Sequence, residues 1–279
     1  MNLLDGKLTA AKVKAEIAAK IKNNCELGKR APGLAVILVG ENPASQVYVK
    51  NKIKDCEETG IVSKPFILPE STAEEELIDI IGKLNADNSI DGILVQLPLP
   101  KGIDERRVIE AINPSKDVDA FHPSNVGRIM LGLDGFAPCT PAGVMRLLKE
   151  YNIEISGKNC VVVGRSNIVG KPMALLLLAQ NGTVTICHSR TKNLAEVTKS
   201  ADILVVAVGK ARMITGDMVK DGAVIVDVGM NRVDGKLCGD VDFDSCKDKA
   251  SFITPVPGGV GPMTRAMLLE NTYHAYEAK

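Results

Sequence analysis

Six short apolar runs are spread along the chain, and longer mixed segments separate them. Each run is rich in β-branched residues and almost continuously apolar, as is typical of strands buried on both faces of a parallel sheet. The separating segments are long enough for crossover helices. The pattern therefore predicts an α/β fold with mostly parallel sheets. The runs cover residues 34–40, 92–97, 159–164, 183–189, 203–209 and 223–229.

Helix boundaries are indicated by caps and by helix-breaking residues. Thr72 precedes an acidic run and Glu75 lies three positions later, which is a capping-box pattern. Pro172 is placed where a helix begins, and Gly182 where it stops. Thr264 is a candidate N-cap for a final helix.

The chain has 279 residues, which favours two domains. The last four apolar runs resemble the consecutive strands of one Rossmann-type unit. Residues 132–141 are rich in Gly and Pro, predict a boundary loop, and lead into a helix over 142–150. We expect two three-layer lobes with a cleft between them. The first covers 1–120 and is completed by a C-terminal helix over 265–279, and the second covers 121–264.

Charge and hydropathy exclude some classes of protein. Lys plus Arg and Asp plus Glu are both 34, and no basic run stands out, so we expect no nucleic-acid partner. No apolar stretch approaches the roughly 20 residues that span a bilayer. The N-terminal residues lack a basic segment followed by an apolar one, so we expect no secretory signal and no membrane partner.

The seven cysteines are scattered, odd in number and free of C-x-x-C pairs. This pattern is typical of reduced thiols in the cytoplasm rather than of a disulfide framework or a zinc site. The three histidines show no ligand spacing, so we expect no structural metal.

The segment GRSNIVGKP (164–172) follows a predicted strand and opens a predicted helix. In this context glycines allow close approach of a pyrophosphate, and the helix N-terminus offers N–H donors. The spacing departs from G-x-G-x-x-G, and an ordinary tight turn is the alternative.

The nucleotide preference is indicated after the next strand. An NAD-binding chain often carries Asp or Glu there, whereas this chain has His188, Ser189 and Arg190. Together with Arg165, Arg190 is suited to hold a 2′-phosphate, which favours NADP. The alternative is a pair of solvated arginines.

A candidate catalytic lysine lies in the segment 44–60. Val49, Ile53 and Cys56 form a buried helical stripe, and Tyr48 and Lys52 are neighbours on an adjacent face. A partly desolvated lysine at that margin is usable as an acid or base. The alternative is a solvated surface lysine.

Three further segments carry candidate ligands. Gln96 ends an apolar strand, where its amide is placed to orient a ligand or a neighbouring lysine. Asp117 and Asp119 lie in a turn-like segment, as caps or as partners of heterocycle N–H groups, and His122 is interpreted as structural. The Gly- and Pro-rich residues 253–264 form a loop suited to approach a flat ring.

Taken together and in this order, six segments resemble the signature blocks of the bifunctional methylenetetrahydrofolate dehydrogenase/cyclohydrolase family, over nearly the whole chain. The blocks are YVKNK, DGILVQLPLP, KDVDAFHPSNVGR, PCTPAG, VVVGRSNIVGKPMA and ITPVPGGVGPMT.

The resemblance implies that Lys52 is catalytic, with Tyr48 and Gln96 assisting, and that Asp119 anchors the pterin ring. It implies a folate site, NADP as the cofactor, and a homodimer. The implied substrate-binding residues are Tyr48, Lys52, Gln96, Leu97, Asp119, Gly261 and Pro262. The implied cofactor-binding residues are Gly164, Arg165, Ser166, Val169, Ser189, Arg190, Gly209, Met230 and Thr264.

The chain departs from the family pattern at Ala120, where the family has glycine. We expect a methyl group to be tolerated there unless the position requires a positive φ. Alternatives to the bifunctional enzyme are a monofunctional folate dehydrogenase, another two-lobe NADP-dependent oxidoreductase, and a non-catalytic dinucleotide sensor.

Overall fold

The computed structural model describes residues 1–279, apart from the side chain of Ala44. The chain divides into two compact units, each built from two separate stretches. Unit 1 comprises residues 1–10 and 140–264, and unit 2 comprises residues 11–139 and 265–279.

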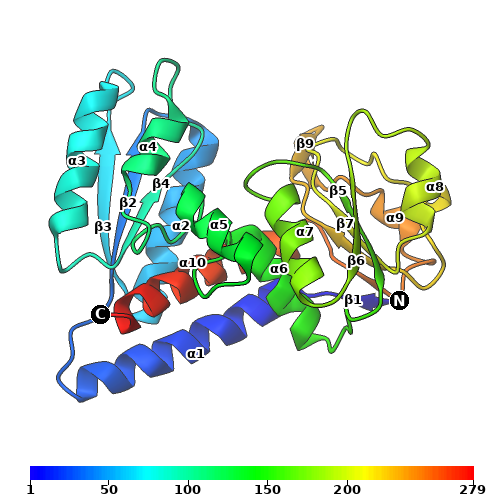
Figure 1. Ribbon diagram of the computed structural model, residues 1–279, viewed down its shortest axis with the longest axis horizontal. Helices are drawn as coiled ribbons and strands as arrows, with labels where there is room; N and C mark the ends of the chain where they lie inside the picture. The colour runs from blue at the N-terminus through cyan, green and yellow to red at the C-terminus, as the bar shows by residue number, and fades with distance from the viewer. The chain divides into compact units, whose positions relative to one another are not determined.

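Unit 1 is built on a six-stranded sheet in the order β1-β11-β8-β7-β5-β6, in which every neighbouring pair is parallel (Figure 1). The last four predicted apolar runs are confirmed as strands of this sheet, in a Rossmann-like alternation with helices. The strands are β1 (Asn2–Leu3), β5 (Asn159–Val163), β6 (Thr183–Cys187), β7 (Ile203–Val206), β8 (Val224–Asp227) and β11 (Phe252–Ile253).

Apolar clusters cover both faces of this sheet, which explains the nearly continuous apolarity of β5, β7 and β8. One cluster joins the strands to α6 (Cys139–Glu150) and α7 (Gly170–Ala179). The other joins them to α8 (Leu194–Lys199), α9 (Phe243–Cys246) and the 3₁₀ turn η1 (Gly216–Met218). Unit 1 therefore has the predicted three layers.

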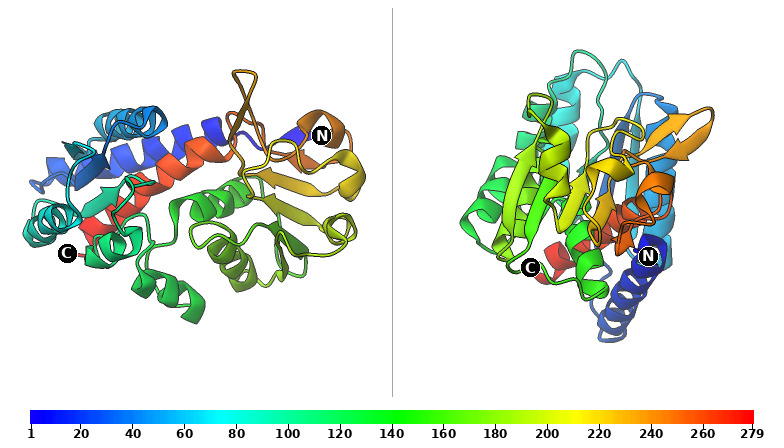
Figure 2. Two further views of the ribbon diagram at one scale, coloured as in Figure 1. Left: turned by 90° about the horizontal axis from the view of Figure 1, so that it is seen from above. Right: turned by 90° about the vertical axis from the view of Figure 1, so that its right-hand side faces the viewer.

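Strand β6 differs from the prediction of burial on both faces. It lies at the edge of the sheet with only β5 beside it, and Thr183, Thr185 and Ile186 are exposed. A two-stranded hairpin of β9 (Asn231–Val233) and β10 (Lys236–Cys238) projects from the same unit (Figure 2).

Unit 2 contains a parallel sheet in the order β3-β2-β4. Alternate residues of β2 pack on α3 and α4, and the intervening residues are buried as well, so both faces are covered. The strands are β2 (Gly33–Val39), β3 (Val62–Leu68) and β4 (Gly92–Val95). The helices are α2 (Pro43–Thr59), α3 (Glu74–Ala86), α4 (Glu105–Ala111) and α5 (Pro123–Leu131), with most of α1 (Gly6–Glu26) and α10 (Val260–Glu277).

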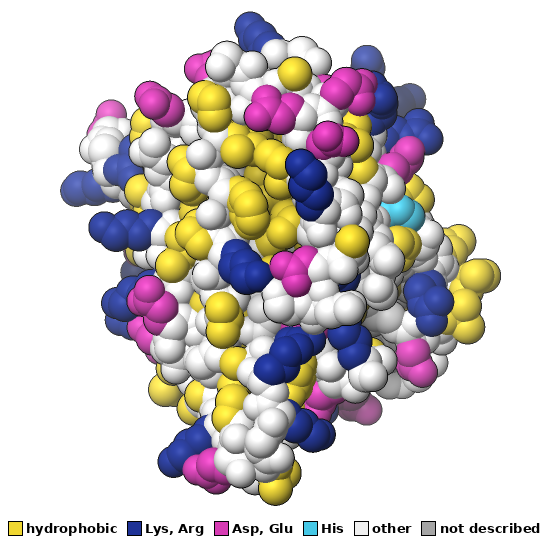
Figure 3. Space-filling model, turned by 90° about the vertical axis from the view of Figure 1, so that its left-hand side faces the viewer, with side chains coloured by type: hydrophobic (Ala, Val, Ile, Leu, Met, Phe, Trp, Pro, Cys, Tyr) yellow, Lys and Arg dark blue, Asp and Glu magenta, His cyan; other side chains and the backbone are white. Residues whose placement is uncertain are grey.

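Strand β3 was not predicted, because it is an edge strand with no long apolar run. Val62 and Ile67 are exposed, and Figure 3, which views the unit from the side of α3 and β3, shows apolar side chains ringed by charged ones. Lys64 and Pro65 lie within the strand, and both residue types discourage further strand pairing at an edge.

Two predicted helix caps are wrong. The hydroxyl of Thr72 donates to the carbonyl of Pro69, and α3 begins at Glu74 without a side-chain cap. Helix α10 begins at Val260, so Thr264 lies inside it and donates back to the Val260 carbonyl. In both cases the hydroxyl binds a nearby carbonyl instead of a helix N–H group.

Within the part of the chain that the structure describes, no helix is both long and apolar enough to cross a membrane. Among the same residues, no group of three or more His, Cys, Asp or Glu side chains is arranged to hold a metal ion.

Candidate active site

Lys52 lies on α2 and is buried, with only 8% of its surface exposed. Its ammonium group donates a hydrogen bond to Oε1 of Gln96, at 3.1 Å. The alternative of a solvated lysine is therefore wrong, and the predicted contact between Gln96 and a neighbouring lysine is present.

The Gln96 side chain is oriented by the backbone around it. Gln96 directly follows β4, and its N–H donates to the carbonyl of Ile37 at 2.8 Å, which continues the sheet. Its Nε2 donates to the carbonyl of Leu97 at 2.7 Å. Because the amide nitrogen is engaged in this way, the amide oxygen is left to face Lys52.

Tyr48 lies one helical turn before Lys52 on α2, and 37% of its surface is exposed. Burial raises the pKa of the Tyr48 hydroxyl, and the positive charge of Arg265 opposes that rise. Arg265 forms an ion pair with Asp55 at 3.0 Å, and Lys14 forms another with the same carboxylate at 3.0 Å. No sequence motif marks this network, because its members are far apart in the chain.

Asp119 lies near the end of β4. Asp117 forms a parallel bridge with Ile93, which puts Asp119 at the edge of the sheet where Gln96 lies. Burial raises the pKa of Asp119, and the positive charge of Lys52 acts in the opposite direction. The structure therefore brings Tyr48, Lys52, Gln96 and Asp119 to one end of the unit 2 sheet.

Ala120 adopts a left-handed conformation with φ of 59° and is fully buried. A methyl group was expected to be tolerated at this position unless the backbone requires a positive φ, and the backbone does require one. A β-carbon is strained in that region, and glycine is the residue that avoids the strain.

Two residues that the sequence analysis missed support the Asp119 loop. The thiol of Cys139 lies 3.5 Å from Oδ1 of Asp119. The side-chain amide of Asn271, on α10, donates to the carbonyls of Val118 at 2.8 Å and Ala137 at 3.1 Å. The PCTPAG block contains Cys139, so its motif was a signal for the thiol, whereas no local pattern marks Asn271.

His122 is structural, as interpreted from the sequence, and of the two alternatives for Asp117 the structure shows the turn-stabilising one. One oxygen of Asp117 accepts hydrogen bonds from the His122 N–H and the Asn125 amide, each at 2.8 Å. Nδ1 of His122 accepts from the N–H of Ser124 at 3.0 Å and caps α5.

In unit 1, the segment 164–172 has the predicted context, following β5 and opening α7. Gly164 has φ of 131°, and a β-carbon there would lie 2.3 Å from the carbonyl oxygen of Ala207, so only glycine fits. The hydroxyl of Ser166 accepts hydrogen bonds from the N–H groups of Val169 at 3.1 Å and Gly170 at 3.3 Å. The loop is thus tightly closed around the start of the helix.

Arg165, Ser189 and Arg190 lie in loops that leave neighbouring strands at the same edge of the sheet. Strands β5 and β6 pair with Val163 opposite Cys187, and all three side chains are exposed. Nδ1 of His188 accepts a hydrogen bond from the Arg190 N–H at 3.1 Å, which shapes the second loop. The donor chemistry of this edge fits a phosphate group.

The remaining predicted cofactor residues also lie in unit 1. Gly209 follows β7 and has φ of 65°, and Met230 follows β8. The end of the Met230 side chain lies 3.3 Å from the position that a β-carbon on Gly261 would take. Gly261, Pro262 and Thr264 all belong to the first turns of α10, and the Thr264 hydroxyl is 2.9 Å from that of Thr140.

The chain is similar to known proteins along its whole length. Residues 4–119 match the model of the tetrahydrofolate dehydrogenase/cyclohydrolase catalytic domain, and residues 138–279 match that of the NAD(P)-binding domain. The bifunctional protein FolD of Sulfurihydrogenibium sp. is 62% identical, over 100% of this chain and 99% of the relative.

Solved structures agree with this likeness. The bifunctional FolD enzyme of Campylobacter jejuni is 54% identical with a TM-score of 0.98, covering 100% of this chain and 99% of that one. The FolD of Trypanosoma brucei, complexed with NADP cofactor and inhibitor, is 37% identical with a TM-score of 0.94, covering 98% and 96%. The chain belongs to the tetrahydrofolate dehydrogenase/cyclohydrolase family.

Proposed function

We propose that the protein oxidises 5,10-methylenetetrahydrofolate with NADP⁺ and hydrolyses the resulting 5,10-methenyl compound to 10-formyltetrahydrofolate. The buried contact between Lys52 and Gln96 carries this proposal, because it supplies a group for the hydrolytic step. The similarity to bifunctional relatives over the full chain supports both activities.

We assign folate binding and catalysis to the lobe formed by residues 1–120 and 265–279, and NADP binding to residues 121–264. The catalytic-domain match ends at residue 119 and the NAD(P)-binding match begins at residue 138, which supports a boundary near residue 120. The grouping of residues 265–279 with residues 11–139 in one compact unit supports the assignment of the C-terminal helix. The proposed lobes differ from the compact units at two segments. Residues 1–10 belong to unit 1, because β1 joins its sheet, and residues 121–139, which include α5, belong to unit 2.

The oxidation requires little acid–base help from the protein. A nitrogen lone pair of the folate drives hydride off the one-carbon unit and leaves the methenyl cation. NADP⁺, when bound, accepts this hydride. The contribution of the chain is to bind and orient the substrate, with Asp119 facing the pterin ring and Tyr48 and Leu97 beside it.

The hydrolysis requires proton movement. Water adds to the methenyl carbon, one carbon–nitrogen bond then breaks, and a proton is released as the formyl group forms. Lys52 is the group that holds or moves this proton, with Gln96 fixing its position and Tyr48 on the adjacent turn. A positioned acid–base group typically contributes about 10²–10⁴-fold to such a step.

The test is Lys52→Met, with Lys50→Met as the matched control on an exposed position of the same helix. NADPH and the methenyl compound are followed together by absorbance. We expect the Lys52 variant to form NADPH while the methenyl compound accumulates, and the control to hydrolyse it. Full hydrolysis by a folded Lys52→Met variant would refute the role. Absence of NADPH formation in the unmodified protein would refute the dehydrogenase function.

The preference for NADP over NAD is proposed to come from Arg165, in the loop after β5, and from Arg190, which follows Ser189 in the loop after β6. An exposed arginine pair at this edge matches the charge and geometry of a 2′-phosphate. Arg165→Ala should raise the KM for NADP⁺ by about tenfold, which is the effect expected from losing one charge-assisted hydrogen bond. The KM for NAD⁺ should stay unchanged, because NAD⁺ lacks the 2′-phosphate. An equal effect on both nucleotides would contradict this assignment.

The protein is proposed to form a homodimer through strand β6. The outer edge of β6 has no neighbour in the described sheet, and Ile186 is 41% exposed. An exposed, apolar edge strand is suited to pairing with a second copy. Ile186→Lys should yield monomers in light scattering, whereas Val62→Lys on edge strand β3 should not. A monomeric unmodified protein would exclude the dimer.

A cytoplasmic location is proposed from the cysteines. All seven are free thiols in the structure. Cys25 is exposed, Cys238 is half-buried, and the buried ones are Cys56, Cys139, Cys160, Cys187 and Cys246. Such thiols are typical of a reducing compartment.

A further inference from the structure

Two buried aspartates in unit 1 have no part in the function described so far. Asp227 ends β8, and Asp240 follows the β9–β10 hairpin. Asp240 is fully buried, and only 3% of the Asp227 surface is exposed. Burying a carboxylate is costly unless hydrogen bonds compensate, so the bonds that these groups make reveal what they hold in place.

Asp240 binds the two loops that follow β7 and β8. Its Oδ2 accepts hydrogen bonds from the N–H groups of Val208 at 2.6 Å and Gly209 at 2.9 Å. Its Oδ1 accepts from the N–H of Lys210 at 2.8 Å and from the side-chain amide of Asn231 at 2.9 Å. Three successive N–H groups form a concavity that binds anions, and here a side chain of the protein fills it.

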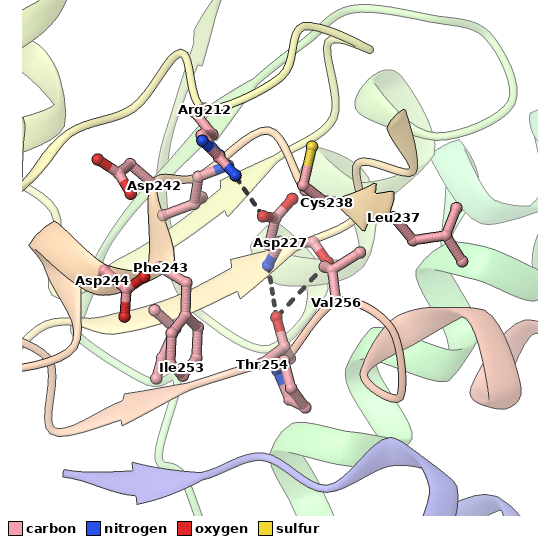
Figure 4. A pocket seen from close by; sticks show the side chains of 13 residues that line it. Arg212, Asp227, Leu237, Cys238, Asp242, Phe243, Asp244, Ile253, Thr254 and Val256 are labelled. Carbon is pink, nitrogen blue, oxygen red and sulfur yellow. Dashed lines mark hydrogen bonds between the residues drawn. The ribbon is translucent and has the colours of Figure 1, made fainter. Parts of the chain in front are cut away.

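Asp227 in turn holds Asp240. Its Oδ1 accepts from the N–H groups of Gly229 and Asp240, and its Oδ2 accepts from that of Val241, each at 2.9 Å. Its own N–H donates to the hydroxyl of Thr254 at 2.7 Å, a contact that Figure 4 shows at the wall of a pocket of about 280 Å³. Burial raises the pKa of Asp227 to about 6, although these N–H groups oppose the rise.

The backbone is shaped to admit this pair. A β-carbon on Gly229 would lie 2.3 Å from the carboxyl carbon of Asp240, so any larger residue would displace the carboxylate. Gly229 precedes Met230, and Asp240 directly binds Gly209. Together the two aspartates therefore hold the loop after β7, which carries Gly209, and the loop after β8, which carries Met230.

We propose that Asp240 is a positioning residue for NADP binding. It ties the loop of Gly209 to the loop of Met230 and Asn231, and so holds both in a binding-ready shape before the nucleotide arrives. This inference rests on the proposed assignment of those loops to the cofactor. A preorganised site binds more tightly because less ordering is required on binding.

Two substitutions test the role at different strengths. Asp240→Asn replaces one accepting oxygen with an NH₂ group that cannot accept an N–H bond. Asn231→Ala removes only the tie between the two loops and leaves the carboxylate in place. The matched control is Asp202→Asn, at the start of β7, where the carboxylate accepts from the N–H of Asn159 at 2.9 Å and pairs with Lys220.

The Kd for NADP⁺ is measured by titration calorimetry, and the KM for each substrate and the rate of hydrolysis of the methenyl compound are measured on the same preparations. We expect the Kd and KM for NADP⁺ to rise about tenfold in Asp240→Asn and about threefold in Asn231→Ala, as expected for the loss of hydrogen bonds to a charged group. The KM for the folate and the hydrolysis rate should stay within about twofold of the unmodified protein.

The outcomes separate the two proposals. If Asp240→Asn does not fold, Asn231→Ala decides the question. An unchanged Kd for NADP⁺ in Asn231→Ala would overturn the positioning role, as would an equal fall in nucleotide binding and hydrolysis, or the same rise in Kd in Asp202→Asn. Absence of NADP⁺ binding by the unmodified protein would instead overturn the cofactor assignment itself.

Discussion

The substitution Ala120→Gly tests how the Asp119 loop tolerates its departure from the family pattern. Ala120 is fully buried, and its φ of 59° is unfavourable for a residue with a β-carbon. Among the other non-glycine residues with positive φ, asparagine and aspartate predominate, and these tolerate the region best. They are Asn152, Asn181, Asn193, Arg212 and Asp234.

Three contributions set the expected change in the free energy of unfolding. Relief of the left-handed strain stabilises the variant by about 1–2 kcal/mol. The greater freedom of glycine in the unfolded chain costs about 0.4–1 kcal/mol. Loss of one buried methyl group costs about 0.8 kcal/mol. The contributions nearly cancel, so we expect stability to change by less than about 1 kcal/mol.

The control is Ala266→Gly, because Ala266 is equally buried in the same unit but lies within α10. There no strain is relieved, so loss of the methyl group and of helix propensity should together cost about 2 kcal/mol. Urea denaturation followed by circular dichroism gives both values. A loss of about 2 kcal/mol in Ala120→Gly as well would refute the reasoning, because the strain would then be absent.

Two further outcomes follow from buried groups. Asp91 is fully buried and accepts hydrogen bonds from Arg30 and from Lys279; burial works against its charge, but these partners outweigh it and its pKa is lowered. Asp91→Asn should therefore destabilise the protein by about 2 kcal/mol near neutral pH, since both cations are partly exposed. The pKa of Asp91 is lower in the folded than in the unfolded protein, so the extra stability of the unmodified protein should be fully present above about pH 4 and should vanish as the pH falls through the folded pKa. Urea denaturation at a series of pH values measures this difference in stability. A difference that persisted in acid would contradict the reasoning. Iodoacetamide at pH 8 should label Cys25 well before Cys56, because Cys25 is exposed whereas burial raises the pKa of the Cys56 thiol to about 12. Peptide mass spectrometry reports the order, and equal labelling rates would contradict it.

Strands with long apolar runs could be predicted from the sequence because burial on both faces leaves no polar alternation. This held for β2, β4, β5, β7 and β8. Strand β3 was missed because it alternates exposed and half-buried positions and contains Pro65. Strands β1 and β11 have two residues each, too few to produce any periodic pattern.

The candidate site was predictable where a motif carried it, and less so where distant residues meet. The spacing of Tyr48 and Lys52 placed them on neighbouring positions of one helix, but the burial of Lys52 depends on β4 and its Gln96. The roles of Asn271 and Asp240 arise from hydrogen bonds across long separations in the chain, which leave no local signature.

The pairing of β1 with β11 has a consequence for the order in which the protein can be made. Asn2 and Leu3 lie beside Phe252 and Ile253, although nearly the whole chain separates them. Unit 2 likewise waits for residues 265–279, which bring Asn271 to the Asp119 loop. During synthesis, unit 1 cannot be completed until Phe252 and Ile253 have left the ribosome, and unit 2 cannot be completed until residues 265–279 have done so. Many multidomain proteins fold their N-terminal domain before the following domain has been synthesised. This protein cannot complete either unit in that order, because each unit combines an early stretch of the chain with a late one.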